Sequence, residues 1–132
     1  DNGYIMPEQA KSLSRDKLKT LFESDFASRM FNADKIYREI KVSSYVPVNQ
    51  IEDTQYTDSV LIQGIADCVF EENGELVLVD YKTDRVSCEE ELLDLYKNQI
   101  AFYRKAVEKT LKKPVKEAVL YSFALNKICI YK

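Results

Sequence analysis

The stretch GIADCVFEENGELVLVDYKTD, residues 64–84, decides the fold predicted for this chain. Two apolar segments flank Asn73-Gly74, a dipeptide typical of the two-residue turn of a β-hairpin because both positions tolerate positive φ. Asp67 and Asp80 interrupt segments that otherwise consist largely of core residues. The sequence therefore predicts a hairpin at the centre of the sheet that carries two acidic side chains.

The length of the turn determines how the two aspartates face each other. With a two-residue turn, Asp67 falls directly opposite Asp80, and strand periodicity places Lys82 on the same face as Asp80. A four-residue loop would leave the acids diagonal on one face, whereas a three-residue loop would send them to opposite faces. Opposed carboxylates about 5 Å apart repel by roughly 3 kcal/mol at an effective dielectric of about 20. We therefore expect a cation between them.

Two interpretations of these residues remain open at this point. A divalent hard cation such as Mg²⁺ accepts carboxylate oxygens and keeps positions for water and phosphate, while a nearby lysine orients or deprotonates the attacking water. In that case Asp67, Asp80 and Lys82 form a phosphodiesterase centre. In the alternative, Lys82 simply pairs with Asp80, and Asp67 is a strand-end residue in water.

The remaining pattern predicts an α/β fold with the order helices, three strands, helix, two strands. Helical spacing extends over residues 7–33 in two pieces, with Ser14 and Ser24 as N-caps. Ser87 and Glu90 form a capping box that opens a long helix, which ends before Pro114. The strands are expected at 36–48, 60–70, 75–83, 115–124 and 128–131, with a loop over 49–59.

The hairpin strands are apolar on both faces, which favours helices on both sides of a mixed central sheet of about five strands. With 132 residues and 45% hydrophobic content, the chain fits a single domain, residues 1–132. It comprises a helical segment over 1–34 and a core over 35–132. Because the chain begins at Asp1 without an initiator Met and contains no histidine, we expect it to be a fragment of a larger protein.

Charge and cysteine content exclude several classes of protein. A net charge of −3 gives no broad basic field for unaided binding to a phosphate backbone. Cys68, Cys88 and Cys129 are odd in number and lack a C-x-x-C pair, which argues against a disulfide framework, a zinc site and an iron–sulfur cluster. There is neither a signal-peptide pattern nor an apolar run long enough for a membrane span. These features indicate a protein of the reducing cytoplasm, with no membrane partner.

Three motifs in order, GIAD, LVDYKTD and QIAFY, resemble the RecB-type nuclease signature of the PD-(D/E)XK superfamily: G-x-x-D, D-Y-K-T and Q-x-x-x-Y. The flanking sequences YREI and DYKTDRV most resemble the C-terminal nuclease domain of the AddA component of AddAB-type ATP-dependent helicase–nucleases. The resemblance implies a restriction-endonuclease-like core. It also implies that Asp67 and Asp80 bind the metal and that Lys82 is the catalytic lysine.

Three further residues match supporting positions of the family. Gln99 and Tyr103 match the pair beside the active centre, and as i and i+4 residues they lie on one helix face. Without the resemblance, Gln99 would be satisfied at the helix margin and Tyr103 would belong to the core. Glu39 matches a recurrent acidic position on the first strand; in the alternative it pairs with Arg38 or Lys41 on the strand surface.

The resemblance implies a Mg²⁺-dependent DNA exonuclease domain that acts in double-strand break processing and recombinational repair in the bacterial cytoplasm. Mn²⁺ also suits oxygen ligands. The implied partners are DNA, the helicase domains of the same polypeptide and a second, AddB-like subunit. No G-x-x-x-x-G-K-[ST] loop occurs, so ATP would be used only by a motor domain outside this chain. The four-cysteine cluster of some relatives is absent, and no iron–sulfur cluster is inferred for this segment.

The sequence departs from the family at one metal ligand. Members of the family carry a histidine on a helix upstream of the sheet, and this chain has none. We therefore expect this segment alone to bind metal weakly and to cleave poorly. The second hypothesis is a non-catalytic module that keeps the nuclease fold and serves as a docking or DNA-guiding surface within the same complex.

Overall fold

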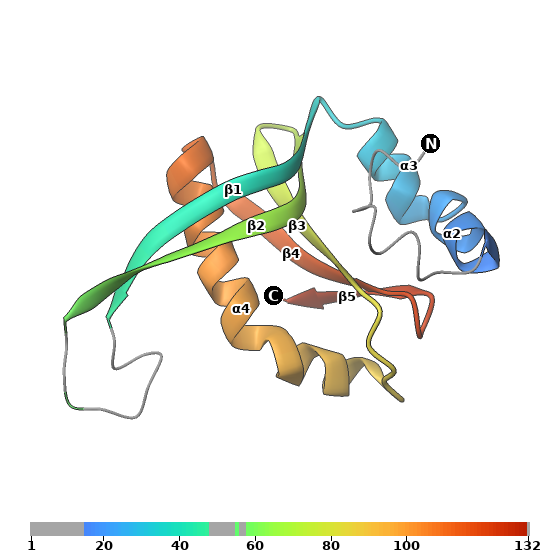
Figure 1. Ribbon diagram of the computed structural model, residues 1–132. Coiled ribbons are helices and arrows are strands. Elements are labelled where there is room, and N and C mark those ends of the chain that lie inside the picture. Colours follow the sequence, from blue (N-terminus) through green and yellow to red (C-terminus); the bar gives the residue numbers. More distant parts are fainter. Residues whose placement is uncertain (1–14, 48–54, 56–57, 132) are drawn as a thin grey trace.

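The computed structural model describes residues 15–47, 55 and 58–131, which form one five-stranded sheet and three helices (Figure 1). The chain order is α2 (Arg15–Phe22), α3 (Asp25–Phe31), β1 (Lys35–Pro47), β2 (Ser59–Glu72), β3 (Glu75–Lys82), α4 (Glu89–Leu111), β4 (Val115–Ser122) and β5 (Lys127–Tyr131). The predicted order of helices and strands is confirmed. Most of the predicted loop over 49–59, and the N-cap expected at Ser14, lie outside the described residues.

The strands follow one another across the sheet in chain order, from β1 to β5. Neighbouring strands are antiparallel except β3 and β4, which are parallel. A parallel pair needs a long crossover connection, and α4 supplies it. The sheet is therefore mixed, as the sequence predicted.

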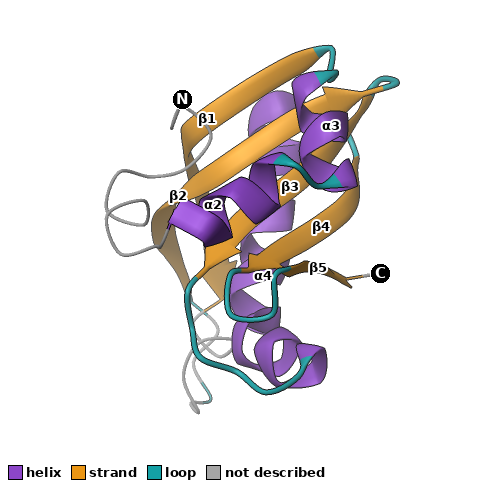
Figure 2. Cartoon of the chain, turned by 90° about the vertical axis from the view of Figure 1, so that its right-hand side faces the viewer, coloured by secondary structure: helices purple, strands orange, loops and turns teal. Residues whose placement is uncertain are grey.

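Helices cover both faces of the sheet: α2 and α3 lie on one side and α4 on the other (Figure 2). Each face has its own buried cluster. The cluster under α4 includes Val69, Leu76, Leu78, Leu92, Ile100 and Leu120. The cluster under α2 and α3 includes Leu21, Phe26, Met30, Phe70, Val77 and Val79. The apolar character of both faces of the hairpin strands follows from this double coverage.

The central hairpin has the predicted register. Glu72 pairs with Glu75, and Asn73 and Gly74 both have positive φ, 55° and 80°, as a two-residue primed turn requires. The ladder continues as far as Cys68 and its partner on β3. The two-residue turn predicted from Asn73-Gly74 is therefore confirmed.

The outer part of the hairpin does not follow strict alternation along β2. Val69 and Ala66 both belong to the cluster under α4, while Cys68, between them, belongs to the opposite cluster. Residues three apart in a regular strand point to opposite faces. The alternation is therefore broken at Asp67, between these residues.

The neighbouring strand is distorted at the same level. Glu39 has a φ of 51°, the left-handed region that a non-glycine residue adopts at a cost. Tyr37 and Ile40 both pack against the cluster under α4, although they are three residues apart. The pairs on either side of Glu39 keep one register, so β1 and β2 bend together without slipping. By alternation from Val69, Asp67 already lies on the α4 side, and the shared bend brings Ala66 to that side as well.

The helix ends agree with the sequence in one case and differ in another. Ser24 caps α3 as predicted, because its side chain accepts a hydrogen bond from the Ala27 backbone N–H. The predicted capping box at the start of α4 is wrong: the N-cap is Cys88, which makes no capping bond through its side chain. The Ser87 backbone N–H instead donates to Glu91 Oε2 at 3.1 Å. Glu91, one residue beyond the predicted Glu90, therefore bonds back to the segment before the helix.

The C-terminus of α4 provides a test of the backbone geometry. Lys112 is the C-cap residue with φ 56° and ψ 39°, and its N–H donates to the Glu108 carbonyl. Glycine adopts this left-handed conformation without the steric cost of a Cβ. We predict that Lys112→Gly raises the free energy of unfolding by up to about 1 kcal/mol, measured by urea denaturation.

The control substitution lies inside the same helix. Lys109→Gly should lower the free energy of unfolding by about 1 kcal/mol, because glycine is a poor residue in a helix interior. Equal losses of stability in both variants would contradict the left-handed geometry at Lys112.

Candidate active site

The sequence predicted that Asp80 and Lys82 would share a face, and the structure places both near the ends of the sheet strands beneath α4. Asp80 is only 6% exposed. The Nζ of Lys82 lies 2.9 Å from Asp80 Oδ2, and both side chains are largely buried. A buried carboxylate needs a partner to remain charged, and Lys82 supplies the positive charge.

Asp67 reaches the same place from β2. Its Oδ2 accepts a hydrogen bond of 2.9 Å from the backbone N–H of Tyr81, the residue between Asp80 and Lys82. The regular pairing of β2 with β3 ends one position earlier, at Cys68 and Val79. The Asp67 carboxyl therefore takes the place of a strand carbonyl where the bend separates the two strands.

The pKa of Asp67 shows how close the two acids are. Burial, together with the hydrogen bond and the negative charge of Asp80, raises this pKa to about 8, against smaller lowering effects from the Tyr81 N–H and Lys82. Two carboxyl groups in contact cannot both ionise freely. At neutral pH, in the absence of a bound cation, Asp67 therefore retains a proton and hydrogen-bonds to Asp80.

The oxygen atoms of the site suit a divalent cation, but few protein side chains converge there as ligands. Asp80 Oδ2 is buried and lacks a hydrogen bond: Lys82 Nζ is near enough, but its approach lacks the angle that a hydrogen bond requires. In the part of the chain that the structure describes, no three His, Cys, Asp or Glu side chains converge as a metal-binding group. Asp67 and Asp80 fit Mg²⁺, which commonly takes one or two carboxylates and retains several waters.

The Lys82 ammonium contacts three partners. Besides Asp80, its Nζ donates to Gln99 Oε1 at 3.1 Å. It also lies 3.8 Å from the centroid of the Tyr96 ring. The hydroxyl of Tyr96 in turn donates to Asp84, 2.9 Å from Oδ1 and 2.8 Å from Oδ2. Gln99 is therefore beside Lys82, as the sequence motif predicts.

Tyr103 lies against the β1–β2 hairpin at Gly64. A Cβ built on Gly64 would be 2.8 Å from Tyr103 Cε1 and 2.9 Å from its hydroxyl oxygen. Burial raises the pKa of Tyr103, and the charges on Asp80 and Asp67 raise it further. Glycine at this position therefore gives Tyr103 access to the neighbourhood of the two acids.

Glu39 does not join the acids, although the sequence proposed it as a supporting residue. It is exposed, and it lies on the bend of β1 with its backbone in the left-handed region. In the described residues it belongs to no metal-binding group with Asp67 and Asp80. Its observed contribution is the left-handed backbone at the bend of β1.

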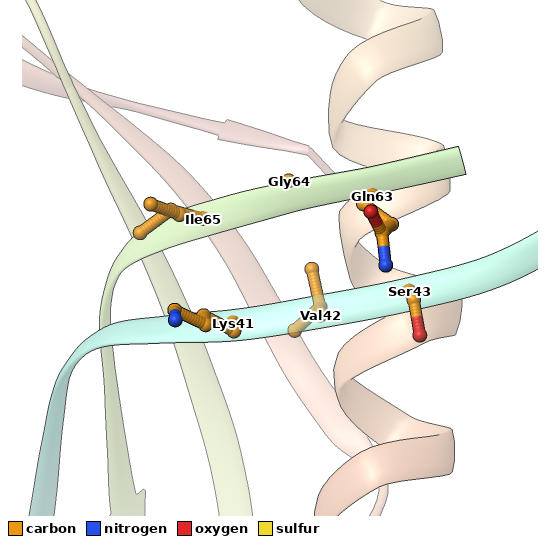
Figure 3. Close-up of a pocket in the computed structure, with 6 residues that line it drawn as sticks. All are labelled: Lys41, Val42, Ser43, Gln63, Gly64 and Ile65. Atoms are coloured by element: carbon orange, nitrogen blue, oxygen red, sulfur yellow. The ribbon is translucent and has the colours of Figure 1, made fainter. Parts of the chain in front are cut away.

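A pocket of about 440 Å³ lies further along the hairpin and contains none of the three central residues. Figure 3 shows its lining on β1 and β2, with α4 behind the strands. The lining residues are Lys41, Val42, Ser43, Gln63, Gly64 and Ile65. Gly64 links this pocket to Tyr103, since it also contacts that ring.

Tyr96 and Asp84 belong to the site, although the sequence motifs did not predict them. Tyr96 lies three residues before Gln99 and therefore shares its side of the helix. Asp84 follows Lys82 by two residues, just past the end of β3. The helical spacing of Tyr96, Gln99 and Tyr103 was the signal that could have identified the first of them.

Comparison with known proteins agrees with this geometry. Residues 5–128 match the PD-(D/E)XK nuclease superfamily. The chain belongs to this superfamily. Its mixed five-stranded sheet with helices on both faces is accordingly a restriction-endonuclease-like fold. In the described part of the chain, the helices are too short or too polar to cross a membrane.

The chain is similar to the AddA-type component of ATP-dependent helicase/nucleases from several bacteria. It is 41% identical over 130 residues to the protein of Clostridium kluyveri. That alignment covers 95% of this chain and 10% of the relative. It is 38% identical over 131 residues to that of Clostridium botulinum (strain Loch Maree / Type A3), with 96% and 10% covered. The match to the Bacillus pumilus protein is 35% identical over 133 residues, with 92% and 11% covered. The chain thus spans about a tenth of these relatives.

Among solved structures, the crystal structure of SSO0001 matches with a TM-score of 0.48 and 17% sequence identity. The alignment covers 86% of this chain and 45% of that one.

The contact between Gly64 and Tyr103 predicts a specific loss of stability. Gly64→Ala forces the Tyr103 ring to move, and overpacking of this kind costs about 1–3 kcal/mol. The thermal unfolding midpoint should fall accordingly. In a Tyr103→Leu background the same substitution should cost clearly less, because the hydroxyl and ring atoms that clash are gone. An equal cost in both backgrounds would contradict the contact.

The raised pKa of Asp67 predicts how stability varies with pH when a chelator removes divalent ions. A folded carboxyl that binds its proton more tightly than the unfolded chain contributes stability at low pH, and this contribution is lost as pH rises toward about 8. The free energy of unfolding should therefore fall between about pH 5 and pH 8 by at most about 1.4 kcal/mol per pH unit.

Replacing the titrating group tests this prediction. Asp67→Asn should remove the loss of stability, since an amide keeps a neutral side chain at every pH. Asp94→Asn, an exposed position on α4, should keep the wild-type pH dependence. Identical urea-denaturation profiles for wild type and Asp67→Asn from pH 5 to pH 8 would contradict the prediction.

Proposed function

We propose that this chain is a Mg²⁺-dependent DNA nuclease domain that hydrolyses phosphodiester bonds as an exonuclease. The observation that carries the proposal is a pair of carboxyl groups on neighbouring strands, half-buried Asp67 and buried Asp80, with the Lys82 ammonium 2.9 Å from Asp80. Nucleases of this superfamily generally use divalent metal ions, which supports the assignment of a cation to these acids.

In this proposal, Asp67 and Asp80 hold Mg²⁺, with Mn²⁺ as a possible substitute. The bound ion supplies a Lewis acid that polarises the phosphate and lowers the pKa of a bound water. Asp67 gives up its proton when the cation binds, because a protonated carboxyl is a poor ligand. The buried site also strengthens each electrostatic contact, since its dielectric constant is lower than that of water.

Lys82 is assigned a contact with either the reacting water or the charged oxygens of the phosphate. The reaction adds the water oxygen to phosphorus and breaks one ester P–O bond, and the proton lost by the water balances the one gained by the leaving alkoxide. The products are a phosphate monoester and an alcohol. Gln99 accepts a hydrogen bond from Lys82 and so limits the orientations of the amine. Tyr103, whose ring lies against Gly64, is assigned a position beside the DNA strand.

The relatives suggest the biological setting. They are named as components of ATP-dependent helicase/nucleases, and this chain corresponds to about a tenth of their length. We therefore place the domain in a helicase–nuclease polypeptide that processes double-strand breaks for recombinational repair in the bacterial cytoplasm. Its partners are then DNA, the helicase domains of the same polypeptide and a second, AddB-like subunit. ATP would be consumed by the helicase domains and not by this one.

The missing histidine predicts weak activity for the isolated domain. Two carboxylates and water make a weaker site than one with a further protein ligand. We therefore propose that residues 1–132 act as a single nuclease domain within a longer polypeptide and depend on that polypeptide for full activity.

Cleavage of single-stranded DNA with Mg²⁺ tests the proposal in the complete polypeptide. Asp80→Ala and Lys82→Ala should each lower the rate by at least about 100-fold, as expected for loss of a metal ligand or of a group that handles protons. Chelation of divalent ions should abolish cleavage. The controls Asp94→Ala and Lys97→Ala, both exposed on α4, should cleave like wild type.

The outcome also separates the enzyme from a non-catalytic module. Wild-type cleavage no faster than that of Asp80→Ala and Lys82→Ala, with DNA still bound, would overturn the nuclease assignment. That result would instead support a docking or DNA-guiding role.

A further inference from the structure

The ammonium group of Lys82 makes one contact that the family motif does not explain. Asp80 and Gln99 contact it through oxygen atoms at 2.9 Å and 3.1 Å. The Tyr96 ring covers another side, with its centroid 3.8 Å from Nζ. A cation over an aromatic face is attracted by the ring quadrupole, and this attraction is stronger when water is excluded. Lys82 is 14% exposed, so much of that water is gone.

The Tyr96 ring is itself fixed by Asp84. The phenol proton is shared between the two carboxylate oxygens, which lie 2.9 Å and 2.8 Å from the hydroxyl oxygen. The pKa of Tyr96 is raised to about 12 by burial and by the hydrogen bond and charge of Asp84, so the phenol remains a donor at neutral pH. Asp84 belongs to the segment that connects β3 to α4. The bond therefore ties this connector to the helix beside Lys82.

A series of contacts links the β3–α4 connector to the amine of Lys82. Asp84 holds the Tyr96 hydroxyl, the Tyr96 ring lies over Lys82, and Lys82 lies beside Asp80. A lysine side chain has four rotatable carbon–carbon bonds and is costly to immobilise. One ion pair leaves an amine free to swing about its partner, whereas a ring on one side and an amide on the other restrict it to one location.

We propose that Tyr96 and Asp84 act as positioning residues that hold the Lys82 amine in its reactive orientation. The proposal rests on the nuclease function proposed above for Asp80 and Lys82. Tyr96 acts through its ring and Asp84 acts through Tyr96. Neither is assigned a contact with metal or DNA.

A direct test is the NMR signal of the Lys82 ε-methylene protons in this chain, without metal or DNA. The ring current of Tyr96 moves protons over its face upfield. Tyr96→Leu should return the signal toward that of a free lysine, whereas Tyr96→Phe, which keeps the ring but loses the hydrogen bond to Asp84, should retain a smaller upfield shift. An unchanged Lys82 signal in Tyr96→Leu would overturn the proposal. If Tyr96→Leu does not fold, the same measurement on Asp84→Ala decides, since loss of the hydrogen bond that fixes the ring should reduce the shift as Tyr96→Phe does.

Kinetics in the complete polypeptide provide the second test. Tyr96→Leu should lower kcat for single-stranded DNA cleavage about tenfold, the size of one desolvated cation–π contact. KM should stay within about twofold of the wild-type value, because Tyr96 is assigned no contact with the bound DNA. An equal loss in kcat and gain in KM would overturn the positioning role. Asp94→Asn, which also removes a carboxylate near α4, serves as the matched control.

A double-mutant cycle identifies the Asp84 bond as the link. Tyr96→Phe and Asp84→Ala each remove the same hydrogen bond, so the double variant should be no slower than the slower single variant. Additive losses would overturn the link. Cleavage by Asp80→Ala at the wild-type rate would count against the nuclease function itself, and the ring-current measurement would still decide whether Tyr96 positions Lys82.

Discussion

The contact between two carboxyl groups, half-buried Asp67 and buried Asp80, is the constraint on which the rest of the site depends. Two charged carboxylates at cross-strand distance would repel by roughly 3 kcal/mol, more than the roughly 0.2–1 kcal/mol that a favourable cross-strand pair provides. The protein accommodates the pair by raising the pKa of Asp67, by donating the Tyr81 N–H and by placing Lys82 beside Asp80. A domain of 132 residues has little stability to spare, so we interpret this costly arrangement as a site for a cation.

The shared bend of β1 and β2 lies next to this contact. Asp67 lies beyond the last regular pair of the hairpin, and a straight strand would have placed it on the opposite face from Gly64. Because alternation is broken there, the acid on β2 and the close contact of Gly64 with Tyr103 both lie on the α4 side. One backbone distortion thus brings together the acids and the helix face that carries Gln99, Tyr96 and Tyr103.

The parts of the structure that local chemistry dictates could be predicted from sequence. Asn73-Gly74 determines the turn, the turn determines the register, and the register places Asp67 and Asp80 within reach of each other. The double coverage of the sheet followed from the apolar faces of its strands. Three motifs in order were enough to predict the superfamily, which the match over residues 5–128 shows.

The failures have a common physical origin in tertiary context. Glutamate has no preference for positive φ, so nothing at Glu39 indicated a bend, which surrounding packing imposes on it. The first turn of α4 contains three glutamates in succession, and a pattern alone could not decide which of them would reach back to the preceding segment. Tyr96 resembled a core residue because an aromatic ring on an apolar face usually is one. Its role depends on Asp84 and Lys82, which the β3–α4 connection brings to it.

The central claim is that Asp67 and Asp80 share one divalent ion, and a crystal soaked in Mn²⁺ tests it most directly. Anomalous diffraction locates the ion without assuming its ligands. The account predicts a peak within coordination distance of one oxygen from each carboxyl group, and its loss in crystals of Asp80→Ala. A peak bound elsewhere, or none at Mn²⁺ concentrations that support cleavage by the complete polypeptide, would contradict it.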